Sequence, residues 1–303
     1  MTKAAAEATK PAITTPAISQ AMIDAYDEYT HLTLDRRRFM EQLTRLAGSG
    51  AAAAAIAPLL AANSAQAAIV ADNDPRVKAQ DITYPGSSGE MKGYLVKPAD
   101  QSGKLGSVIV VHENRGLNPH IRDVARRVAL EGFVALAPDF LSPLGGTPTD
   151  EDKARDMFTK LDASQVTADG LATIAYLKAE KDGNGKVGAV GFCWGGGAVN
   201  DLAVNAPDLA AGVAYYGMQP KAEDAAKIKA ALLLHYAGLD ERIDAGIDAY
   251  KKALDAAHVE YTVYVYDGVN HAFNNDTSAA RYDKKAADLA WGRTIAFLKE
   301  KLA

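Results

Sequence analysis

The sequence has very little cysteine: Cys193 is the single cysteine among 303 residues. One thiol cannot close an intramolecular disulfide, so a disulfide-stapled fold is excluded. The chain also lacks a Cys-x-x-Cys pair and a His-Glu-x-x-His segment, which are common signatures of zinc sites. We therefore expect neither a metal nor any other cofactor.

The chain also has no excess of basic residues. The chain holds 33 Lys and Arg against 38 Asp and Glu, for a formal net charge of −5. Such a chain offers no cationic field to attract the phosphates of nucleic acid or an anionic lipid surface, and no nucleic-acid partner is expected. Hydrophobic residues make up 48% of the sequence, which is enough for a substantial core.

The first 67 residues have the layout of an export signal. A basic cluster, Arg36 to Arg38, precedes Phe39, a weakly apolar Ala/Leu run follows, and the segment ends in small residues at Ala65-Gln66-Ala67. The run over 47–62 is shorter than the roughly 20 apolar residues that a membrane span needs. The order of these parts indicates a signal of the twin-arginine type, recognised by the export machinery and cleaved after Ala67. The alternative is an Ala-rich helix with an incidental basic cluster.

We therefore divide the chain into an export signal, residues 1–67, and one folded domain, residues 68–303, located in the bacterial periplasm or secreted. In the second part, short β-branched runs alternate with longer helical patterns. This alternation predicts an α/β fold with a mostly parallel central sheet of about eight strands and helices on both faces. The strands are mainly continuous apolar runs, which suit burial on both faces of a sheet.

The expected elements can be given by range. Strands are predicted at 108–113, 133–140, 187–192, 211–217, 230–238 and 260–268, after an antiparallel hairpin formed by 78–86 and 91–99. Helices are predicted at 119–132, 151–180 with a break, 194–206, 244–257 and 279–301. The segment 182–186 is interpreted as a turn, and 123–127 as a solvated helix face.

The local setting of Cys193 indicates a nucleophile. In Gly191-Phe192-Cys193-Trp194-Gly195 a strand ends and a helix begins, which matches the G-x-S-x-G nucleophile elbow with sulfur in place of oxygen. Glycines at both flanks allow the close backbone approach of this turn, and the helix N-terminus favours a thiolate. A free cysteine is more often a small buried hydrophobe, but the elbow favours the catalytic interpretation.

Two further residues complete a possible triad. In α/β-hydrolases the acid and then the histidine follow the nucleophile in chain order, each after a later strand. Asp240 follows the predicted strand 230–238, and His271 lies in the loop after the last predicted strand. His271 would accept the proton of the Cys193 thiol, and Asp240 would fix the tautomer of the imidazole.

The same pattern predicts an oxyanion hole. Its donors would be the backbone N–H groups of Trp194 and Asn114, which lies in the loop after strand 108–113. His112 and His235 fall within predicted strands and are expected to be packed residues rather than competitors of His271.

Five short motifs resemble the dienelactone hydrolase family, also called carboxymethylenebutenolidases, over essentially all of 68–303. They are GFCWGG, AGLDE, GVNHAF, VHENRG and AYYG. The resemblance implies the α/β-hydrolase fold, a Cys-His-Asp triad and a small ester or lactone substrate. It also implies that Glu113 lies beside the resting cysteine and receives the thiol proton when substrate enters. The alternative for Glu113 is an ion pair with Arg115 on an exposed loop.

The sequence departs from the family where a substrate carboxylate would bind. The family implies two arginines there, one shortly after the catalytic histidine, and this chain has Asn275 at that place. Arg155 and Arg281 are the substitutes that the sequence offers. Tyr216 and Phe273 are candidates for an apolar substrate pocket. Recognition of an anionic substrate and the oligomeric state stay open.

These observations predict a cysteine-dependent hydrolase of a small ester or lactone that acts through a thioacyl-enzyme intermediate. One alternative is a periplasmic thiol redox protein in which Cys193 forms a sulfenate, although such proteins usually also have a resolving cysteine. Another is a binding protein that keeps the fold without turnover.

Overall fold

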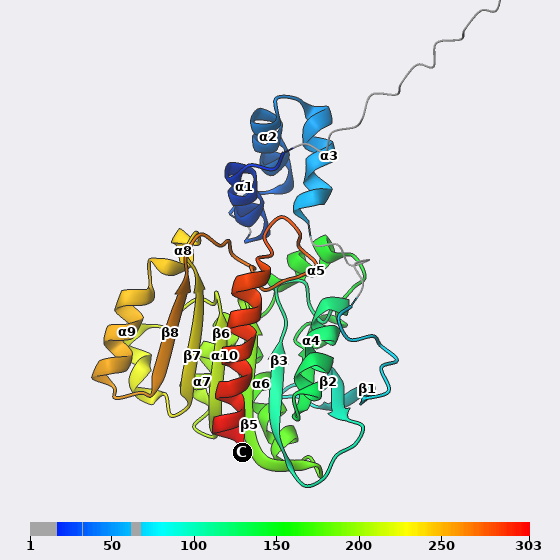
Figure 1. The fold of residues 1–303 in the computed structure, drawn as a ribbon, viewed down its shortest axis with the longest axis vertical. Helices are drawn as coiled ribbons and strands as arrows, with labels where there is room; N and C mark the ends of the chain where they lie inside the picture. Colours follow the sequence, from blue (N-terminus) through cyan, green and yellow to red (C-terminus); the bar gives the residue numbers. More distant parts are fainter. Residues whose placement is uncertain (1–16, 32, 62–67) are drawn as a thin grey trace, which may run out of the picture. The chain divides into compact units, whose positions relative to one another are not determined.

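The computed structural model describes residues 17–31, 33–61 and 68–303 (Figure 1). Contacts within the chain define two units, Met1–Ala62 and Asn63–Ala303. The predicted cleavage motif Ala65-Gln66-Ala67 lies outside the described residues.

The described part of the first unit is helical. It contains α1 (Gln20–Thr30), α2 (Arg36–Ala47) and α3 (Gly50–Leu60). Phe39 of α2 stacks on the ring of Tyr29 with ring centroids 4.7 Å apart. Among the described helices none is by itself long and apolar enough to cross a bilayer, and only α2 and α3 together, bent by 112°, meet that length and composition.

Within residues 68–303, eight strands form one sheet in the order β1-β2-β4-β3-β5-β6-β7-β8. The strands are β1 (Val77–Pro85), β2 (Glu90–Pro98), β3 (Leu105–Val111), β4 (Val134–Asp139), β5 (Gly183–Phe192), β6 (Leu209–Tyr215), β7 (Ala231–Ala237) and β8 (Tyr261–Tyr266). The pairs β1–β2 and β2–β4 are antiparallel, and every other pair is parallel. The predicted mostly parallel sheet with an antiparallel hairpin at its edge is confirmed.

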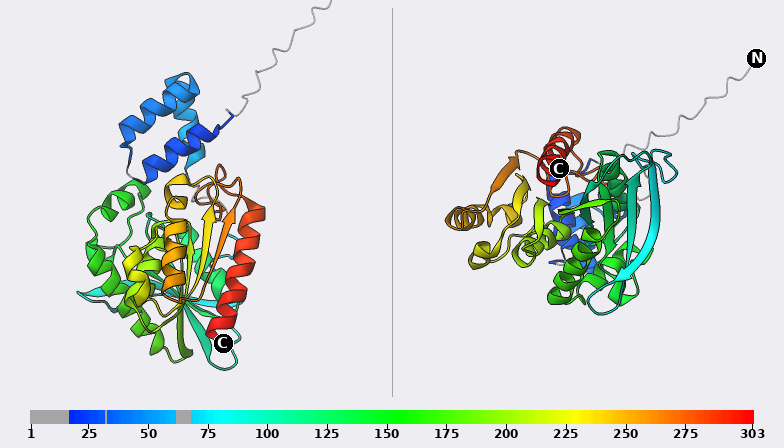
Figure 2. Two further views of the ribbon diagram at one scale, coloured as in Figure 1. Left: turned by 90° about the vertical axis from the view of Figure 1, so that its left-hand side faces the viewer. Right: turned by 90° about the horizontal axis from the view of Figure 1, so that it is seen from below.

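Helices cover both faces of this sheet (Figure 2). They are α4 (Pro119–Leu130), α5 (Glu151–Phe158), α6 (Ala163–Lys178), α7 (Trp194–Asn205), α8 (Glu241–Asp244), α9 (Ile247–Ala256) and α10 (Lys284–Leu302), with short 3-10 helices at Ser142–Leu144 and Ala222–Lys227. Side chains of β3 alternate between the faces: Val108 and Val110 pack in the cluster that includes α4 and α10, and Ile109 and Val111 pack in the cluster that includes α6 and α7. Burial on both faces explains why these strands are continuous apolar runs.

Two predicted boundaries were wrong. β5 begins at Gly183, so most of the segment 182–186 is strand rather than turn. Gly183 pairs with Leu105 across a register shift in β3, so the turn-like composition is overridden by pairing with a distant strand. α10 begins at Lys284 rather than at 279, because the carboxylate of Asp283 accepts a hydrogen bond from the backbone N–H of Ala286 and caps the helix there.

The start of α7 lies directly against the end of β3. A Cβ atom added at Gly195 would lie 2.5 Å from the carbonyl oxygen of His112 and 2.6 Å from that of Val111. At Gly197, two residues further along the same helix, the nearest atoms would be 3.7 Å away, on Met218. Gly195 therefore permits a backbone contact that no other residue allows.

The difference between the surroundings of Gly195 and Gly197 predicts different effects of alanine substitutions on stability. Gly195→Ala should lower the free energy of unfolding by about 1–3 kcal/mol or more, because backbone atoms must move to admit the Cβ. Gly197→Ala should leave stability unchanged or raise it by up to about 1 kcal/mol, since alanine is the better helix former. Urea unfolding of both variants measures the difference, and equal effects would show that the contact at Gly195 is unimportant.

Candidate active site

Cys193 lies on the turn between β5 and α7 in a strained conformation. Its φ is 57° and its ψ is −117°, a region that residues other than glycine rarely adopt. Its N–H donates to the carbonyl oxygen of Tyr215 (3.0 Å), and its own carbonyl accepts from the N–H of Gly196 (3.0 Å). Tyr216 and Ala272 also have positive φ values, of 39° and 65°. Strained backbone thus recurs in the segments that carry the predicted site residues.

The structure brings the three residues of the predicted triad together. Nδ1 of His271 lies 2.5 Å from Oδ2 of Asp240, and both side chains are buried. The Sγ atom of Cys193 and a ring nitrogen of His271 are within 4.8 Å of one another. Because an ionised carboxylate can only accept, Asp240 holds the hydrogen of the neutral imidazole on Nδ1 and leaves Nε2 as the basic nitrogen. The arrangement can move a proton from the thiol to the imidazole.

The position of Asp240 is itself fixed by the backbone. It is the N-cap residue of α8, and its Oδ1 accepts a hydrogen bond from the N–H of Ile243 (3.3 Å). One carboxylate oxygen is therefore used to begin the helix and the other faces His271.

Tyr216 lies against the imidazole. The ring centroids of Tyr216 and His271 are 4.7 Å apart. Burial raises the pKa of Tyr216 well above its usual value, and the negative charges of Glu113 and Cys193 act in the same direction. Its buried hydroxyl has no hydrogen-bond partner among the described residues. Phe273 packs edge-on against Tyr216, with centroids 5.5 Å apart, and is completely buried. Of these two predicted pocket residues, Tyr216 adjoins the imidazole and Phe273 supports it.

Glu113 is bound by Asn275 and not by Arg115. The amide Nδ2 of Asn275 donates to Oε2 of Glu113 at 2.9 Å, and both side chains are buried. The guanidinium of Arg115 lies 3.5 Å from Asp152 and donates to the carbonyl oxygen of Glu151. The alternative of an exposed Glu113–Arg115 ion pair is therefore wrong. Asn275, which replaces the arginine that the family implies, holds the glutamate in place.

The two candidate arginines have different surroundings. Arg155, on α5, is buried and pairs with Asp152 (3.4 Å) and Asp156 (3.1 Å). Nε of Arg281 donates to the hydroxyl of Ser278 (3.0 Å), and its charge opposes the rise in the pKa of Tyr216 that burial causes. Arg281 is therefore the candidate that lies near the other site residues.

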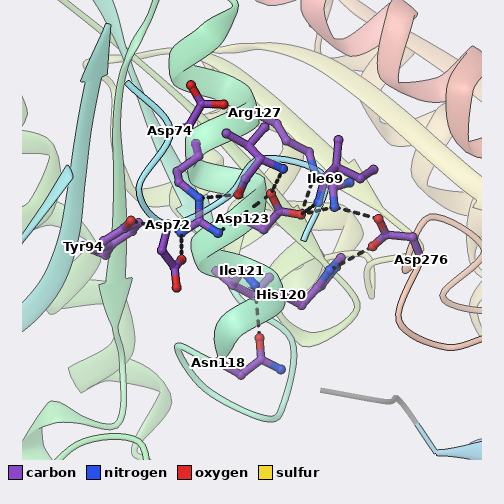
Figure 3. Close-up of polar contacts among 12 residues, drawn as sticks. Ile69, Asp72, Asp74, Tyr94, Asn118, His120, Ile121, Asp123, Arg127 and Asp276 are labelled. Atoms are coloured by element: carbon purple, nitrogen blue, oxygen red, sulfur yellow. Dashed lines mark hydrogen bonds and ion pairs between the residues drawn. The ribbon is translucent and has the colours of Figure 1, made fainter. Parts of the chain in front are cut away.

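The loop that carries His271 is attached to α4 through Asp276 (Figure 3). One carboxylate oxygen of Asp276 accepts from Nη2 of Arg127 (2.7 Å), and the other lies 3.2 Å from Nδ1 of His120. Arg127 also binds Asp123 of its own helix. These ion pairs connect the histidine loop to the body of the domain.

The prediction that 123–127 is a solvated helix face was wrong; Figure 3 shows the polar contacts that Asp123 and Arg127 make. Asp123 and Arg126 are only 2% and 1% exposed. The carboxylate of Asp123 accepts the backbone N–H groups of Ile69 (3.0 Å) and Val70 (2.8 Å), and Nε of Arg126 donates to the carbonyl oxygen of Val70 (2.8 Å). A segment that precedes β1 by sequence therefore covers this face, which helical periodicity alone does not reveal.

Taken with the elbow, this architecture defines an α/β-hydrolase: a mostly parallel sheet between helices, with a strained strand-turn-helix at its carboxyl edge and an acid and a histidine on later loops. Residues 91–302 match the model of the dienelactone hydrolase family. The chain belongs to that family and is a hydrolase of the ester or lactone type.

Individual relatives agree with this assignment. A protein of Escherichia coli O157:H7 named "Putative carboxymethylenebutenolidase" is 32% identical over 255 residues, which are 79% of this chain and 93% of the relative. The crystal structure of a "Putative Dienelactone Hydrolase" from Klebsiella pneumoniae is 31% identical, covers 74% of this chain and 98% of its own, and has a TM-score of 0.68. A dienelactone hydrolase-like promiscuous phosphotriesterase from metagenomic libraries is 25% identical, covers 75% of this chain and 100% of its own, and has a TM-score of 0.69.

The sequence alone does not predict the contact between Asn275 and Glu113 or the anchoring role of Asp276. Asn275 and Glu113 are 162 positions apart, and no local pattern links them. The one available signal was the position of Asn275 four residues after His271, where the family places an arginine.

The ion pairs of Asp276 predict a pH-dependent contribution to stability. Burial alone would raise the pKa of Asp276, but the contact with His120 and the charge of Arg127 outweigh burial and lower the pKa below the usual value of 3.8. A lowered pKa in the folded state stabilises the protein above pH 3.8, and this stabilisation is lost as the pH falls through the lower, folded-state value.

Asp276→Asn should therefore lower the free energy of unfolding by about 1–3 kcal/mol at pH 7, and by less as the pH falls below about 4. Chemical denaturation at several pH values measures this. Asp208→Asn, which removes an exposed ion pair with Lys178, is the matched control and should cost less than about 1 kcal/mol. A pH-independent loss in Asp276→Asn would contradict the assignment of the effect to these charges.

Proposed function

We propose that this hydrolase uses Cys193 as its nucleophile and acts on a small carboxylic ester or lactone through a thioacyl intermediate. The observation that carries the proposal is the combination of the strained elbow at Cys193 with the imidazole of His271 within 4.8 Å and the carboxylate of Asp240 behind it at 2.5 Å. A strained nucleophile, a base and an acid that orients the base are the groups on which nucleophilic catalysis depends.

In the proposed reaction, Nε2 of His271 accepts the proton of the Cys193 thiol, Sγ attacks the acyl carbon, and a C–S bond forms as the carbonyl oxygen becomes the oxyanion. His271 donates a proton to the leaving oxygen as the C–O bond breaks. His271 then removes a proton from water, which attacks the thioester and releases the carboxylic acid and the thiol. Asp240 keeps the proton of the imidazole on Nδ1 throughout these steps.

Glu113 is proposed as a second proton acceptor for the thiol. Glu113 and Cys193 both raise the pKa of Tyr216, which supports a position of both side chains near that hydroxyl. Asn275 binds Oε2, so Oε1 is the oxygen that would take the thiol proton when substrate enters, and this proton must then reach Nε2 of His271 before the leaving oxygen is protonated.

The oxyanion of the tetrahedral intermediate would be bound by the backbone N–H groups of Trp194 and Asn114. Trp194 is the first residue of α7, where N–H groups have no partner within the helix. Arg281 and the hydroxyl of Tyr216 are the polar groups that we propose beside the substrate, whereas Arg155 is paired with carboxylates of its own helix.

Two other functions compete with this one. In a thiol redox protein Cys193 would form a sulfenate, but the sequence offers no second cysteine to resolve it. A binding protein would not need the hydrogen bond between His271 and Asp240 or the strained turn. Mixing the protein with an activated acyl ester tests both alternatives.

We expect the purified chain, quenched shortly after mixing with an activated acyl ester, to gain the mass of the acyl group at Cys193. Cys193→Ala should form no adduct, and His271→Ala should form it slowly or retain it, with kcat reduced about 10³–10⁴-fold or more in both. Intact-mass and peptide mass spectrometry locate the adduct. A folded protein that neither forms an adduct nor turns over any small ester or lactone would rule out the proposed function.

We further propose that residues 1–67 direct export and that cleavage follows Ala67. In bacterial cells, the chain with both Arg36→Lys and Arg37→Lys should remain in the cytoplasm, since lysine lacks the planar guanidinium that a twin-arginine receptor recognises. Arg45→Lys in the same segment is the control and should still be exported. Cell fractionation with N-terminal sequencing measures this, and an exported double variant or a mature N-terminus other than Ala68 would contradict it.

A further inference from the structure

His112 is a buried histidine with a fixed tautomer. It follows the last residue of β3, and its Nδ1 lies 2.8 Å from the carbonyl oxygen of Glu113. Its Nε2 lies 3.1 Å from the backbone nitrogen of Phe140. A backbone N–H can only donate, so Nε2 is the accepting nitrogen and Nδ1 carries the hydrogen that is donated to Glu113. Burial lowers the pKa of His112, which keeps the ring in this neutral form.

The carbonyl that His112 binds belongs to the peptide group between Glu113 and Asn114. All described peptide bonds are trans, and in a trans peptide the C=O and N–H bonds point in opposite directions. The carbonyl oxygen of Glu113 accepts from Nδ1 of His112 (2.8 Å) and, over a longer distance, from the N–H of Gly116 (3.3 Å); the shorter bond draws the oxygen towards His112. It thereby turns the N–H of Asn114 away from His112, and this N–H is one of the two proposed oxyanion donors.

The ring of His112 also supports the residue that supplies the other donor. It stacks on the indole of Trp194, with centroids 5.4 Å apart and planes inclined by 13°. Phe140 and Phe158 pack edge-on against both rings. The backbone of α7 also contacts the carbonyl oxygen of His112, at Gly195. One side chain thus contacts both segments that the oxyanion hole requires.

We propose that His112 is a positioning residue of the oxyanion hole: its Nδ1–H fixes the direction of the Asn114 N–H, and its ring fixes the first residue of α7. The inference rests on the proposed function, because the oxyanion hole belongs to it. His112 does not touch the substrate. Its effect is to hold two donors in place before the reaction, so that they need no reorganisation in the transition state.

Two substitutions separate the hydrogen bond from the ring. In His112→Asn the amide Nδ2 can take the place of Nδ1 and donate to the carbonyl of Glu113, whereas His112→Phe keeps a stacking ring and has no donor. We expect His112→Phe to lower kcat about 10²–10³-fold with little change in KM, as when an oxyanion donor is removed. We expect His112→Asn to recover kcat to within about tenfold of the unsubstituted protein.

His235→Phe is the matched control. His235 is equally buried and uses both ring nitrogens, but its partners are the side-chain hydroxyls of Tyr266 (2.9 Å) and Thr294 (3.1 Å) rather than a peptide group of the site. Its loss should lower the melting temperature without the fall in kcat. Any of three results overturns the proposal. The first is an unchanged kcat in His112→Phe, and the second is an equal loss of kcat in His112→Asn and His112→Phe. The third is a loss of kcat in His235→Phe as large as that in His112→Phe.

A second measurement does not depend on activity. In the full chain with ¹⁵N-labelled histidine, nuclear magnetic resonance should show His112 protonated at Nδ1 and unprotonated at Nε2, with the signal assigned by its absence in His112→Asn. The opposite tautomer would overturn the proposal even in an active enzyme. The expected tautomer in a chain that never acylates Cys193 would instead mean that the geometry holds and the proposed function fails.

Discussion

The close approach of backbone at the β5–α7 turn is the constraint on which the site depends. Gly191 and Gly195 allow strand, turn and helix to approach within distances that a Cβ would block, since an atom added at Gly191 would lie 2.1 Å from the carbonyl oxygen of Gly195. The turn forces Cys193 into a positive φ and places it at the start of α7. At Gly195 the same turn packs α7 against the end of β3, from which the loop with Glu113 and Asn114 continues.

The parallel sheet supplies the remaining groups. Functional residues of open α/β sheets gather beyond the carboxyl ends of the strands, because those ends share one edge. Glu113 follows β3, Tyr216 follows β6, Asp240 follows β7 and His271 follows β8. Two of these loops have attachments beyond the sheet. Asp240 is fixed by capping α8, and the loop of His271 is fixed through Asp276 to the charges of α4.

Three buried polar side chains around the site have partners of a definite direction. The imidazole of His271 is oriented by Asp240, that of His112 by the N–H of Phe140, and the carboxylate of Glu113 by the amide of Asn275. Because an unpaired buried polar group is costly, each of these bonds restricts its side chain to one orientation. The chemistry proposed for Cys193 depends on that restriction, since a base or an oxyanion donor acts only when it points at the reacting atoms.

The sequence by itself determined the local parts: the strand and helix order, the elbow, and the order of Cys193, Asp240 and His271 on loops along the chain. Each depends on spacing between near neighbours, which a periodic pattern or a short motif records. Only the tertiary structure decided what covers Asp123 and Arg126, which residue binds Glu113, and which tautomer His112 adopts. Those features are contacts between segments as far as 162 residues apart. Their geometry arises when the sheet is assembled, and no local pattern encodes it.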